Sequence, residues 1–527
     1  MDSRCRRGAP LAVLALALAA PAAGAQTCQF LMLLGRDTVA VERYTRTPLR
    51  LEGVVLSPMM GARVEYALSL VADGSVPDLT IASRRPADPV DSLPRQRVTI
   101  AFRGDSAFID GSPGGATRMA VHRGAVPLLN PSVAALEQIV RRARALARDS
   151  VGLEVFALAG GQVLPATVSG LRADTVELVV AGQRVRLAFG ADGGLRGGAI
   201  PAQGIAIVAA PVTAQPLVQA RPDYSAPAGA PYTAEEVRVP SPAGFALAGT
   251  LTRPAGARRP VPCVVTISGS GLQDRDESVP LVAGYRPFRQ IADALARHGI
   301  ATLRLDDRGF GASGGDVSRA TSADFADDVR AALAWLRARP GVDGRRLALL
   351  GHSEGGLIAP LVAAEDRSLR ALVLLAGPAW TGRREVESQA RYAIERDPSI
   401  GADARDSLLR LSAHASESSA TTNAWWRWFL DYDPLPAAGR VRTPVLVLQG
   451  ATDRQVAAEQ AGELAAALRA GGDRDVTVRI LPGVNHLFLD DPVGDPARYP
   501  LLEARALRPE ILDLITGFLH SRLGASR

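Results

Sequence analysis

The ten-residue stretch LALLGHSEGG, residues 347–356, constrains the fold of this chain more than any other segment. Its first four residues are apolar and have the length of a buried strand, and the residues after the glycines can form a helix. A strand, a sharp turn and a helix with Ser353 at the apex is the nucleophile-elbow pattern G-x-S-x-G. Side chains at Gly351 and Gly355 would collide where strand and helix pass each other. We therefore expect the Ser353 hydroxyl to stand clear of a sheet, within reach of a base and a substrate.

The five-residue pattern is weak evidence when taken alone. The chain contains 51 Gly, so G-x-S-x-G can arise by chance. Its context favours the elbow, because a strand precedes it, a helix follows it and candidate partners come later in the chain in the expected order.

The segments around the elbow alternate between strand and helix. From about residue 233 onward, short apolar runs are separated by segments with helical spacing of apolar residues. This alternation predicts an α/β fold, a doubly wound and mostly parallel sheet covered by helices on both faces, with ligand sites at the carboxyl ends of its strands. The expected strands are 236–240, 245–252, 261–268, 300–305, 347–350, 369–375, 444–449 and 476–481, and the expected helices are 287–298, 322–337, 356–364, 456–468 and 509–523.

A serine hydroxyl needs a base before it can act as a nucleophile. Of the six His, only His486 lies in a loop directly after a predicted strand in the downstream part of the chain. His352 precedes Ser353 and is expected to face away from the apex, and the other four lie on predicted helices or in the N-terminal part. His486 is therefore the predicted base.

The imidazole of a catalytic base needs a carboxylate that fixes its tautomer. Asp453 follows the predicted strand at 444–449, and the order Ser353, Asp453, His486 is the order of the hydrolase triad. Asp453 could instead cap the helix predicted to follow it. Asp490 and Asp491 are rival carboxylates, although they come after the histidine and not at a strand end.

A tetrahedral intermediate needs two N–H donors for its oxyanion. The backbone N–H of Glu354, directly after the nucleophile, is one candidate. The second should come from the loop Ser268-Gly269-Ser270-Gly271, where small residues allow the backbone to approach a substrate oxygen. We expect the Ser270 N–H to serve, with Gly271 as the alternative.

The N-terminus has the pattern of a secretory signal peptide. Three Arg precede an apolar core at residues 11–20, and the small residues Ala23-Gly24-Ala25 follow. The core is too short to span a bilayer as a helix. We expect residues 1–25 to be removed by cleavage after Ala25, which predicts a secreted or periplasmic protein and not an integral membrane protein.

Residues 26–208 read as a β-rich accessory domain. Alternating runs are separated by turn signals, and one amphipathic helix is expected at 131–148, whose Arg-rich side is interpreted as a solvated face. No catalytic constellation occurs here, so the sequence predicts no function or partner for this domain. The Pro- and Ala-rich residues 209–232 are expected to be a linker. The expected strands are 49–56, 63–71, 97–102, 107–110, 175–180 and 184–189.

Composition excludes several chemistries. All 60 basic residues are Arg, so Schiff-base, Ser–Lys and P-loop lysine mechanisms are absent. The net charge is +6, but acidic residues lie among the arginines and no nucleic-acid partner is predicted. No cluster has metal-ligand spacing, so no metal or cofactor is expected. Beyond the signal peptide, Cys263 lies in an apolar run and reads as an inert buried thiol, and whether it is bonded to Cys28 is left open.

These residues resemble the α/β-hydrolase superfamily, in particular esterases of the serine aminopeptidase and dienelactone hydrolase-like branch. The resemblance covers residues 233–527 and implies that Ser353, Asp453 and His486 form a catalytic triad. Ser268 departs from the pattern, since many relatives have His before the oxyanion glycine. The segments that carry the resemblance are ISGSGLQDRDE at 267–277, LDDRGFGASGG at 305–315, LLGHSEGG at 349–356, WWRWFLDYDP at 425–434, PVLVLQGATDRQV at 444–456 and LPGVNHLF at 481–488.

The resemblance also implies a helical cap over the active site at residues 378–443. This insertion is rich in aromatic residues, which can either pack the cap onto the body or line an apolar substrate pocket. The candidates for the pocket are Trp425, Trp426, Trp428 and Phe429, and Trp380 and Tyr432 lie in the same insertion.

The combined prediction is an exported serine hydrolase that cleaves small-molecule carboxylic esters through an acyl-enzyme. A serine peptidase of the aminopeptidase kind and a thioesterase are alternatives on the same fold. A binding protein that keeps the fold without turnover is a further alternative, which the presence of all three triad residues argues against.

Overall fold

The computed structural model divides the chain into two compact units at the junction of Ala220 and Arg221. Of the predicted signal peptide, residues 1–24 lie outside the described residues, and cleavage after Ala25 stays a prediction. The structure describes residues 25–111, 115–122, 124–158, 161–398 and 400–524.

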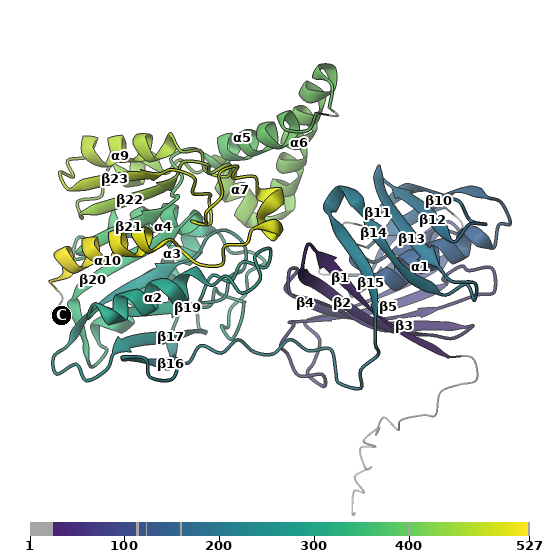
Figure 1. Cartoon of the computed structure of the whole chain (residues 1–527), viewed down its shortest axis with the longest axis horizontal. Coiled ribbons are helices and arrows are strands. Elements are labelled where there is room, and N and C mark those ends of the chain that lie inside the picture. The colour runs from purple at the N-terminus through teal and green to yellow at the C-terminus, as the bar shows by residue number, and fades with distance from the viewer. Residues whose placement is uncertain (1–24, 112–114, 123, 159–160, 399, 525–527) are drawn as a thin grey trace, which may run out of the picture. The chain divides into compact units, whose positions relative to one another are not determined.

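In the described part of the N-terminal unit, fifteen strands form one sheet (Figure 1). Neighbouring strands are antiparallel except β9 and β10, and β1 pairs with both β2 and β15. The β-rich prediction is confirmed. The strands are β1 (Gln26–Leu34), β2 (Asp37–Arg46), β3 (Arg50–Ser57), β4 (Ala62–Ser69), β5 (Asp78–Arg84), β6 (Gln96–Arg103), β7 (Ser106–Asp110), β8 (Thr117–Ala120), β9 (Val126–Leu128), β10 (Ser150–Ala157), β11 (Gln162–Ser169), β12 (Thr175–Val180), β13 (Gln183–Phe189), β14 (Leu195–Ile200) and β15 (Ile205–Ala210).

The expected helix of this unit is α1 (Val133–Arg144), and a buried carboxylate holds its N-terminus. Glu42 of β2 accepts from the backbone N–H of Val133 (2.5 Å) and Ala134 (3.1 Å), and the Tyr66 hydroxyl donates to the same side chain (2.6 Å). Burial raises the pKa of Glu42 to about 6 against the effect of these hydrogen bonds. A negative charge at a helix N-terminus is stabilising, so Glu42 has a structural role.

The predicted linker, 209–232, is fixed at both ends. Arg43 of the N-terminal unit donates to the Thr213 hydroxyl (2.7 Å), and the Tyr224 hydroxyl donates to Asp274 of the C-terminal unit (3.2 Å). Between β15 and the first strand of the C-terminal unit the chain forms no helix or strand.

The C-terminal unit has an eight-stranded sheet in the order β16-β17-β19-β18-β20-β21-β22-β23. The pairs β16–β17 and β17–β19 are antiparallel and the remaining pairs are parallel, which confirms the predicted α/β fold. The strands are β16 (Tyr232–Pro240), β17 (Ala246–Pro254), β18 (Val261–Ile267), β19 (Ala301–Leu305), β20 (Val342–His352), β21 (Ala371–Leu375), β22 (Val445–Gly450) and β23 (Val476–Leu481).

Helices cover both faces of this sheet, so its central strands are apolar on both sides (Figure 1). Leu349 of β20 packs in the core that α3, α4 and α9 share, and its neighbour Leu350 packs in the core of α2 and α10. Each face therefore has its own hydrophobic core. The helices are α2 (Pro287–Arg297), α3 (Ser322–Arg337), α4 (Glu354–Ala363), α9 (Gln460–Ala470) and α10 (Pro509–Leu523).

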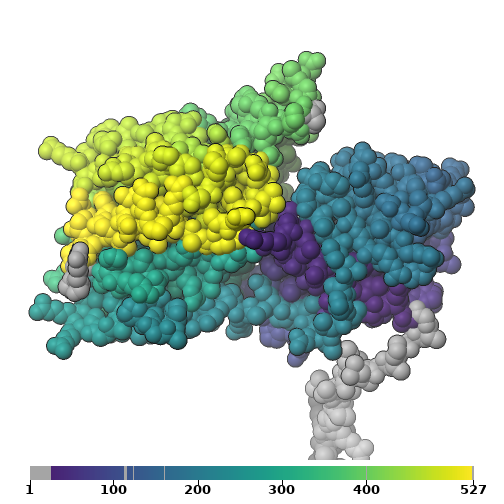
Figure 2. Space-filling view, in the orientation of Figure 1, coloured from purple at the N-terminus to yellow at the C-terminus, as the bar shows by residue number. Residues whose placement is uncertain are grey.

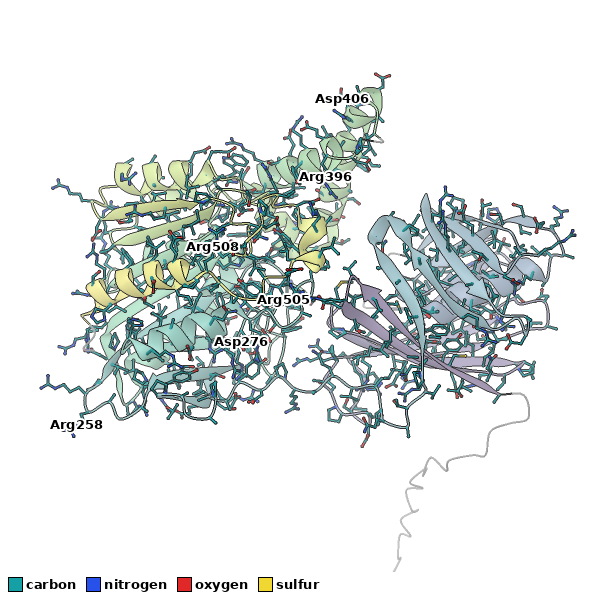
Figure 3. All side chains as sticks on the ribbon, viewed as in Figure 1. Arg258, Asp276, Arg396, Asp406, Arg505 and Arg508 are labelled. Atoms are coloured by element: carbon teal, nitrogen blue, oxygen red, sulfur yellow. The ribbon has the colours of Figure 1, made fainter. Side chains whose placement is uncertain are left out.

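Four helices between β21 and β22 form the predicted helical cap. Two of them, α5 and α6, make an arm that stands out from the body of this unit (Figure 2), and Asp406 lies toward its outer end (Figure 3). No residue of α6 is buried, whereas α7 and α8 return the chain to the body. The cap helices are α5 (Gly382–Glu395), α6 (Ala402–Thr422), α7 (Ala424–Asp431) and α8 (Leu435–Ala438).

Candidate active site

Ser353 occupies the strained turn between β20 and α4. Its φ is +53°, a conformation that costs a residue with a Cβ about 1–2 kcal/mol. The flanking glycines are required, since a Cβ on Gly351 would lie 2.0 Å from the Gly355 carbonyl oxygen and one on Gly355 would lie 2.1 Å from that of Ile267. Ser353 is half-buried, and its hydroxyl forms no hydrogen bond to any described residue.

His486 and Asp453 are in direct contact. His486 lies in the loop after β23, and its Nδ1 is 2.8 Å from Asp453 Oδ2, which also accepts from Gln449 (2.9 Å). Both side chains are buried. The other oxygen of Asp453 accepts from the backbone N–H of Gln455 (2.8 Å) and Val456 (2.9 Å). Asp453 thus orients the imidazole and also caps the following turn, which combines the two roles that the sequence left as alternatives.

The two rival carboxylates lie elsewhere. Asp490 pairs with Arg508, and Asp491 accepts from the backbone of Val493 (3.0 Å) and Gly494 (2.9 Å). Neither has a hydrogen bond or ion pair with His486.

His352 connects the elbow to the His486 loop. The ring centroids of His352 and His486 are 4.8 Å apart, and His352 Nε2 is 2.9 Å from the His486 carbonyl oxygen. The structure thus brings Ser353, Asp453 and His486 to the carboxyl ends of β20, β22 and β23, at one edge of the sheet. The Ser353 hydroxyl and the imidazole are not hydrogen-bonded, and such bonds are often long in ligand-free active sites.

The loop after β18 packs its backbone against the nucleophile. A Cβ on Gly269 would lie 3.2 Å from the Ser353 Cβ, so the loop backbone passes close to the nucleophile and a side chain there would crowd it. The Gly269 N–H is already donated to Glu277 (2.7 Å). Neither the Ser270 nor the Glu354 backbone N–H has a partner in the described part of the chain. Both therefore fit the predicted oxyanion donors.

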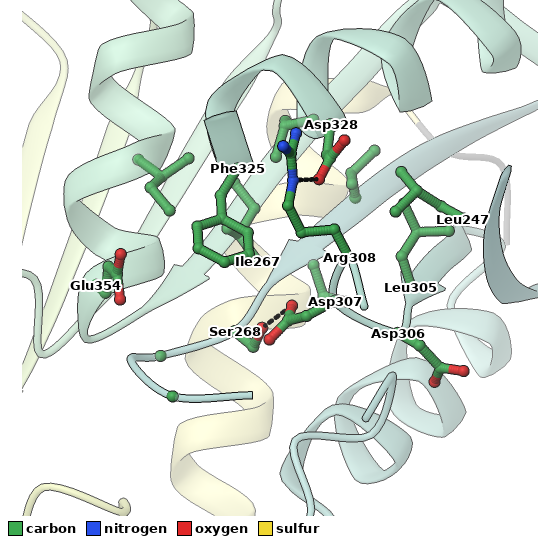
Figure 4. Close-up of a pocket in the computed structure, with 16 residues that line it drawn as sticks. Leu247, Ile267, Ser268, Leu305, Asp306, Asp307, Arg308, Phe325, Asp328 and Glu354 are labelled. Atoms are coloured by element: carbon green, nitrogen blue, oxygen red, sulfur yellow. Dashed lines mark hydrogen bonds and ion pairs between the residues drawn. The ribbon is translucent and has the colours of Figure 1, made fainter. Parts of the chain in front are cut away.

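A cavity of about 50 Å³ lies beside this loop (Figure 4), with room for a few water molecules. Ser268 Oγ donates to Asp307 in its wall (2.8 Å), and Asp307 also accepts from the Gln273 N–H (2.8 Å). Burial raises the pKa of Asp307 well above its usual range, although both hydrogen bonds oppose the shift. Ser268, the departure from the family pattern, thus binds Asp307.

Part of the cap lies against the residue after the nucleophile. The Trp425 indole N–H donates to Glu354 (2.8 Å), which also accepts from the Ser322 hydroxyl (2.6 Å). Trp425 stacks on Phe429 with centroids 4.8 Å apart, and Trp426 meets Trp425 edge-on at 5.2 Å. Burial of the Glu354 carboxyl raises its pKa. These three half-buried rings form one aromatic cluster on α7.

The other cap aromatics attach the cap to the body. Trp428 stacks on Tyr432 with centroids 4.2 Å apart, and both pack against the core of the α3 and α4 face. Trp380 is buried in the same core. Trp428, one of the predicted pocket residues, is therefore separated from the group around Trp425.

No motif or spacing in the sequence indicated a role for Glu277 or a contact for His352. His352 is buried and its Nδ1 lies 2.8 Å from Glu277 Oε1. The available signal was the charged segment 274–277, DRDE, shortly after the oxyanion loop, in which three carboxylates accompany a single arginine.

Both cysteines of the described residues are unbonded. Cys263 is fully buried in β18, and burial raises the pKa of its thiol to about 12, which confirms an inert thiol. Over the described ranges, no group of His, Cys, Asp and Glu side chains could hold a metal ion. None of the helices described is long and apolar enough to cross a membrane.

Comparisons with known proteins find similarity to hydrolases. Residues 283–493 match the family model described as serine aminopeptidase, S33. Esterase EstD of Thermotoga maritima is 26% identical over 250 residues, which cover 46% of this chain and 58% of EstD. Uncharacterized peptidase YuxL of Bacillus subtilis is 26% identical over 259 residues, 48% of this chain and 35% of YuxL. The chain therefore spans between about a third and three-fifths of the length of these relatives.

Among solved structures, the Pyrococcus furiosus esterase Pf2001 is 16% identical with a TM-score of 0.40, covering 56% of this chain and 92% of that one. The family match over residues 283–493, the mixed sheet and the elbow support placing the C-terminal unit in the α/β-hydrolase superfamily. The family match is to the serine aminopeptidase, S33 group, and the two relatives named here are called an esterase and a peptidase.

Proposed function

We propose that this protein is a serine hydrolase that cleaves carboxylic esters, with Ser353 as nucleophile, His486 as base and Asp453 as its partner. The observation that carries the proposal is the 2.8 Å contact between His486 Nδ1 and Asp453, at the sheet edge where Ser353 stands on its strained turn. That contact fixes the proton on Nδ1 and leaves Nε2 as the acceptor for the Ser353 proton.

The reaction proceeds in two steps. His486 takes the Ser353 proton as the hydroxyl attacks the ester carbonyl, and the N–H groups of Ser270 and Glu354 bind the oxyanion. His486 then returns the proton to the leaving alcohol. Water, activated by the same imidazole, clears the acyl-enzyme. Asp453 stays ionised throughout and stabilises the imidazolium.

The substrate site lies between the Gly269 loop and the cap. Trp425, Trp426 and Phe429 supply an apolar aromatic wall, and Trp425 is held in place by its bond to Glu354. Such a wall favours the apolar acyl or alcohol group of an ester. EstD, a relative named as an esterase, supports this substrate class.

A peptidase acting on aminoacyl bonds is the second candidate. The family model that matches residues 283–493 is described as serine aminopeptidase, and YuxL is named as a peptidase. The same triad would serve both reactions, so turnover of ester and aminoacyl substrates must be compared to decide between them. A thioester panel tests the third possibility.

We also propose that the protein is exported. The support is the signal-peptide pattern of residues 1–25, with its three Arg, its apolar core and its small residues before Gln26. Fractionation of cells that produce the full chain, followed by N-terminal sequencing, tests this. An intact Met1 in the cytoplasm would contradict it.

The activity is tested by labelling the protein with a fluorophosphonate and by a panel of p-nitrophenyl esters, aminoacyl anilides and thioesters. We expect labelling at Ser353 and ester turnover that falls by several orders of magnitude in Ser353→Ala. Ser368→Ala, on an exposed serine, is the matched control and should behave as wild type. Undiminished ester turnover in Ser353→Ala would refute the assignment, and turnover of anilides alone would select the peptidase.

A further inference from the structure

The buried pair His352 and Glu277 lies between the three loops that the proposed reaction uses. His352 is next to Ser353 at the elbow. Its ring contacts Glu277, in the loop after β18, through Nδ1 (2.8 Å) and the His486 carbonyl oxygen through Nε2 (2.9 Å). Glu277 Oε1 also accepts from the Gly269 N–H (2.7 Å), one residue before Ser270. Two side chains thus connect the nucleophile, the oxyanion loop and the base.

The hydrogen-bond partners of His352 and Glu277 define where the protons of this pair lie. A carbonyl oxygen only accepts, so His352 Nε2 carries a proton and donates it to His486. Nδ1 and Glu277 Oε1 then share one further proton. The Gly269 N–H donates to that same oxygen and stabilises the carboxylate form. The arrangement therefore favours an imidazolium at His352 paired with a carboxylate at Glu277.

The charges around the ring act in the same direction. Burial by itself disfavours the imidazolium, but the Glu277 charge, its hydrogen bond, the His486 carbonyl and the Asp453 charge outweigh burial and raise the pKa of His352. The Glu277 charge also acts on Asp307 and Tyr285. Burial is the main cause of their raised pKa values, and the Glu277 charge adds to both shifts. His352 is the cation that balances Glu277 in this cluster.

The backbone around Glu277 is fixed by its neighbours. Glu277 has a φ of +54°, and its N–H donates to the Asp274 carbonyl (2.9 Å). Arg275 pairs with Asp306 through two nitrogens (both 3.0 Å), and Asp276 pairs with Arg304. A non-glycine residue persists in this conformation only where its surroundings enforce it. The first three residues of the DRDE segment hold the fourth against His352.

We propose that Glu277 and His352 form an ion pair that positions the Ser270 N–H and the His486 imidazole relative to Ser353. They are positioning residues and do not touch the substrate. This inference rests on the proposed function, because positioning is measured through the reaction of Ser353. Gly269, next to Ser270, lies close to Ser353 and is held by its N–H bond to Glu277, so we expect that a loop released from Glu277 moves the oxyanion donor away from the substrate carbonyl. A misplacement of about 1 Å in an active site lowers the rate about 100-fold.

The direction in which kcat changes with pH follows from the pairing of His352 with Glu277. Since its folded pKa is raised, His352 stays protonated to a higher pH than a free histidine, and positioning is lost as the pH rises through that value. Wild-type kcat should therefore fall on the alkaline side of its profile. Glu277→Gln keeps the shape but removes the charge that favours the imidazolium, so the alkaline limb should move to lower pH.

The experiment compares Glu277→Gln, His352→Gln and the double variant with Asp473→Asn, a buried carboxylate at the opposite end of β23, as control. We expect kcat on p-nitrophenyl esters to fall 10- to 100-fold in each single variant while KM changes less than about threefold. The double variant should lose little more than the worse single variant, because the two residues act as one unit. A folded Glu277→Gln enzyme with kcat within twofold of wild type and an unmoved alkaline limb would overturn the inference.

A second measurement needs neither activity nor a stable Glu277 variant. With only six His, the ring signals of ¹³C-histidine-labelled wild-type protein can be assigned by His→Gln variants at the positions other than His352. We expect the His352 ring to stay protonated to a higher pH than free histidine. A His352 ring that loses its charge at or below the pH at which free histidine does would overturn the ion pair. Failure of wild-type protein to turn over esters or to label at Ser353 would instead refute the proposed function.

Discussion

Asp453→Asn is the sharpest test of the proposed triad, because the contacts of Asp453 decide how an amide would sit. One oxygen faces two backbone N–H donors, Gln455 (2.8 Å) and Val456 (2.9 Å), and the other faces His486 and the Gln449 amide. An asparagine has a single acceptor oxygen. Placing its NH₂ against two N–H donors would leave two buried donors without partners, at about 1–3 kcal/mol each.

The amide should therefore keep its oxygen on the backbone donors and turn its NH₂ toward His486. In that position Nδ1 of His486 must accept, so its proton moves to Nε2 and the imidazole can no longer take the proton of Ser353. A wrong tautomer of this kind lowers kcat about 10⁴-fold, or about 5 kcal/mol of transition-state stabilisation.

The assay is kcat on p-nitrophenyl esters together with the rate of fluorophosphonate labelling, with thermal unfolding to confirm a folded protein. Asp513→Asn, on an exposed position of α10, is the matched control. Both rates should fall together in Asp453→Asn and stay unchanged in the control. A folded Asp453→Asn protein with kcat within tenfold of wild type would show that the carboxylate serves only as a cap for the turn.

Three further predictions concern the elbow, the cap and the N-terminal unit. Gly355→Ala should lower the melting temperature sharply because its Cβ meets backbone, whereas Gly462→Ala in α9, where nothing lies within 4 Å, should raise stability by about 0.5–1 kcal/mol; calorimetry on both variants checks this. Trp425→Ala should raise KM for esters with apolar acyl groups without large loss of stability. Trp428→Ala should lower the stability without a large change in KM, and equal effects of the two variants on KM would contradict the division of the cap aromatics. Because the folded pKa of Glu42 is raised from 4.5 to about 6, its contribution to stability should fall by about 2 kcal/mol in total as the pH rises from well below 4.5 to well above 6, of which about 1 kcal/mol is lost between those two values; denaturant titrations should show a smaller fall for Glu42→Gln than for wild type.

Much of the C-terminal unit could be predicted because its elements carry local signals. The ends of α3, β23 and α10 fall where the sequence placed them, at a capping box formed by Thr321 and Asp324, at a run of alternating residues and at Pro509. The helix α4 begins two residues earlier than expected, at Glu354, because the turn at the apex is complete in one residue. The helix α9 begins at Gln460 and not at 456, because residues 454–459 form turns, the first of which Asp453 caps through the N–H groups of Gln455 and Val456.

Long-range pairs could not be predicted in the same way. The contact of His352 with Glu277 joins residues 75 positions apart, and no spacing or motif in the sequence indicates that these two residues pair. Most strands of the N-terminal unit, such as β1 and β10, were also missed, because their apolar residues do not alternate cleanly and pairing with distant strands decides their conformation. The cap aromatics divide into those near Glu354 and those packed in the core. This division depends on which side of α7 faces Glu354, and the local sequence of the insertion does not determine that side.

The close approach of Gly269 to Ser353 has a consequence for how substrate preference can change in such a protein. The backbone of this loop supplies a proposed oxyanion donor, so replacing residues there is expected to alter the machinery before it alters selectivity. In the proposed site the opposite wall consists of side chains on α7, which belongs to the insertion between β21 and β22. Libraries aimed at new acyl groups should therefore vary Trp425, Trp426 and Phe429 and keep residues 268–271 constant.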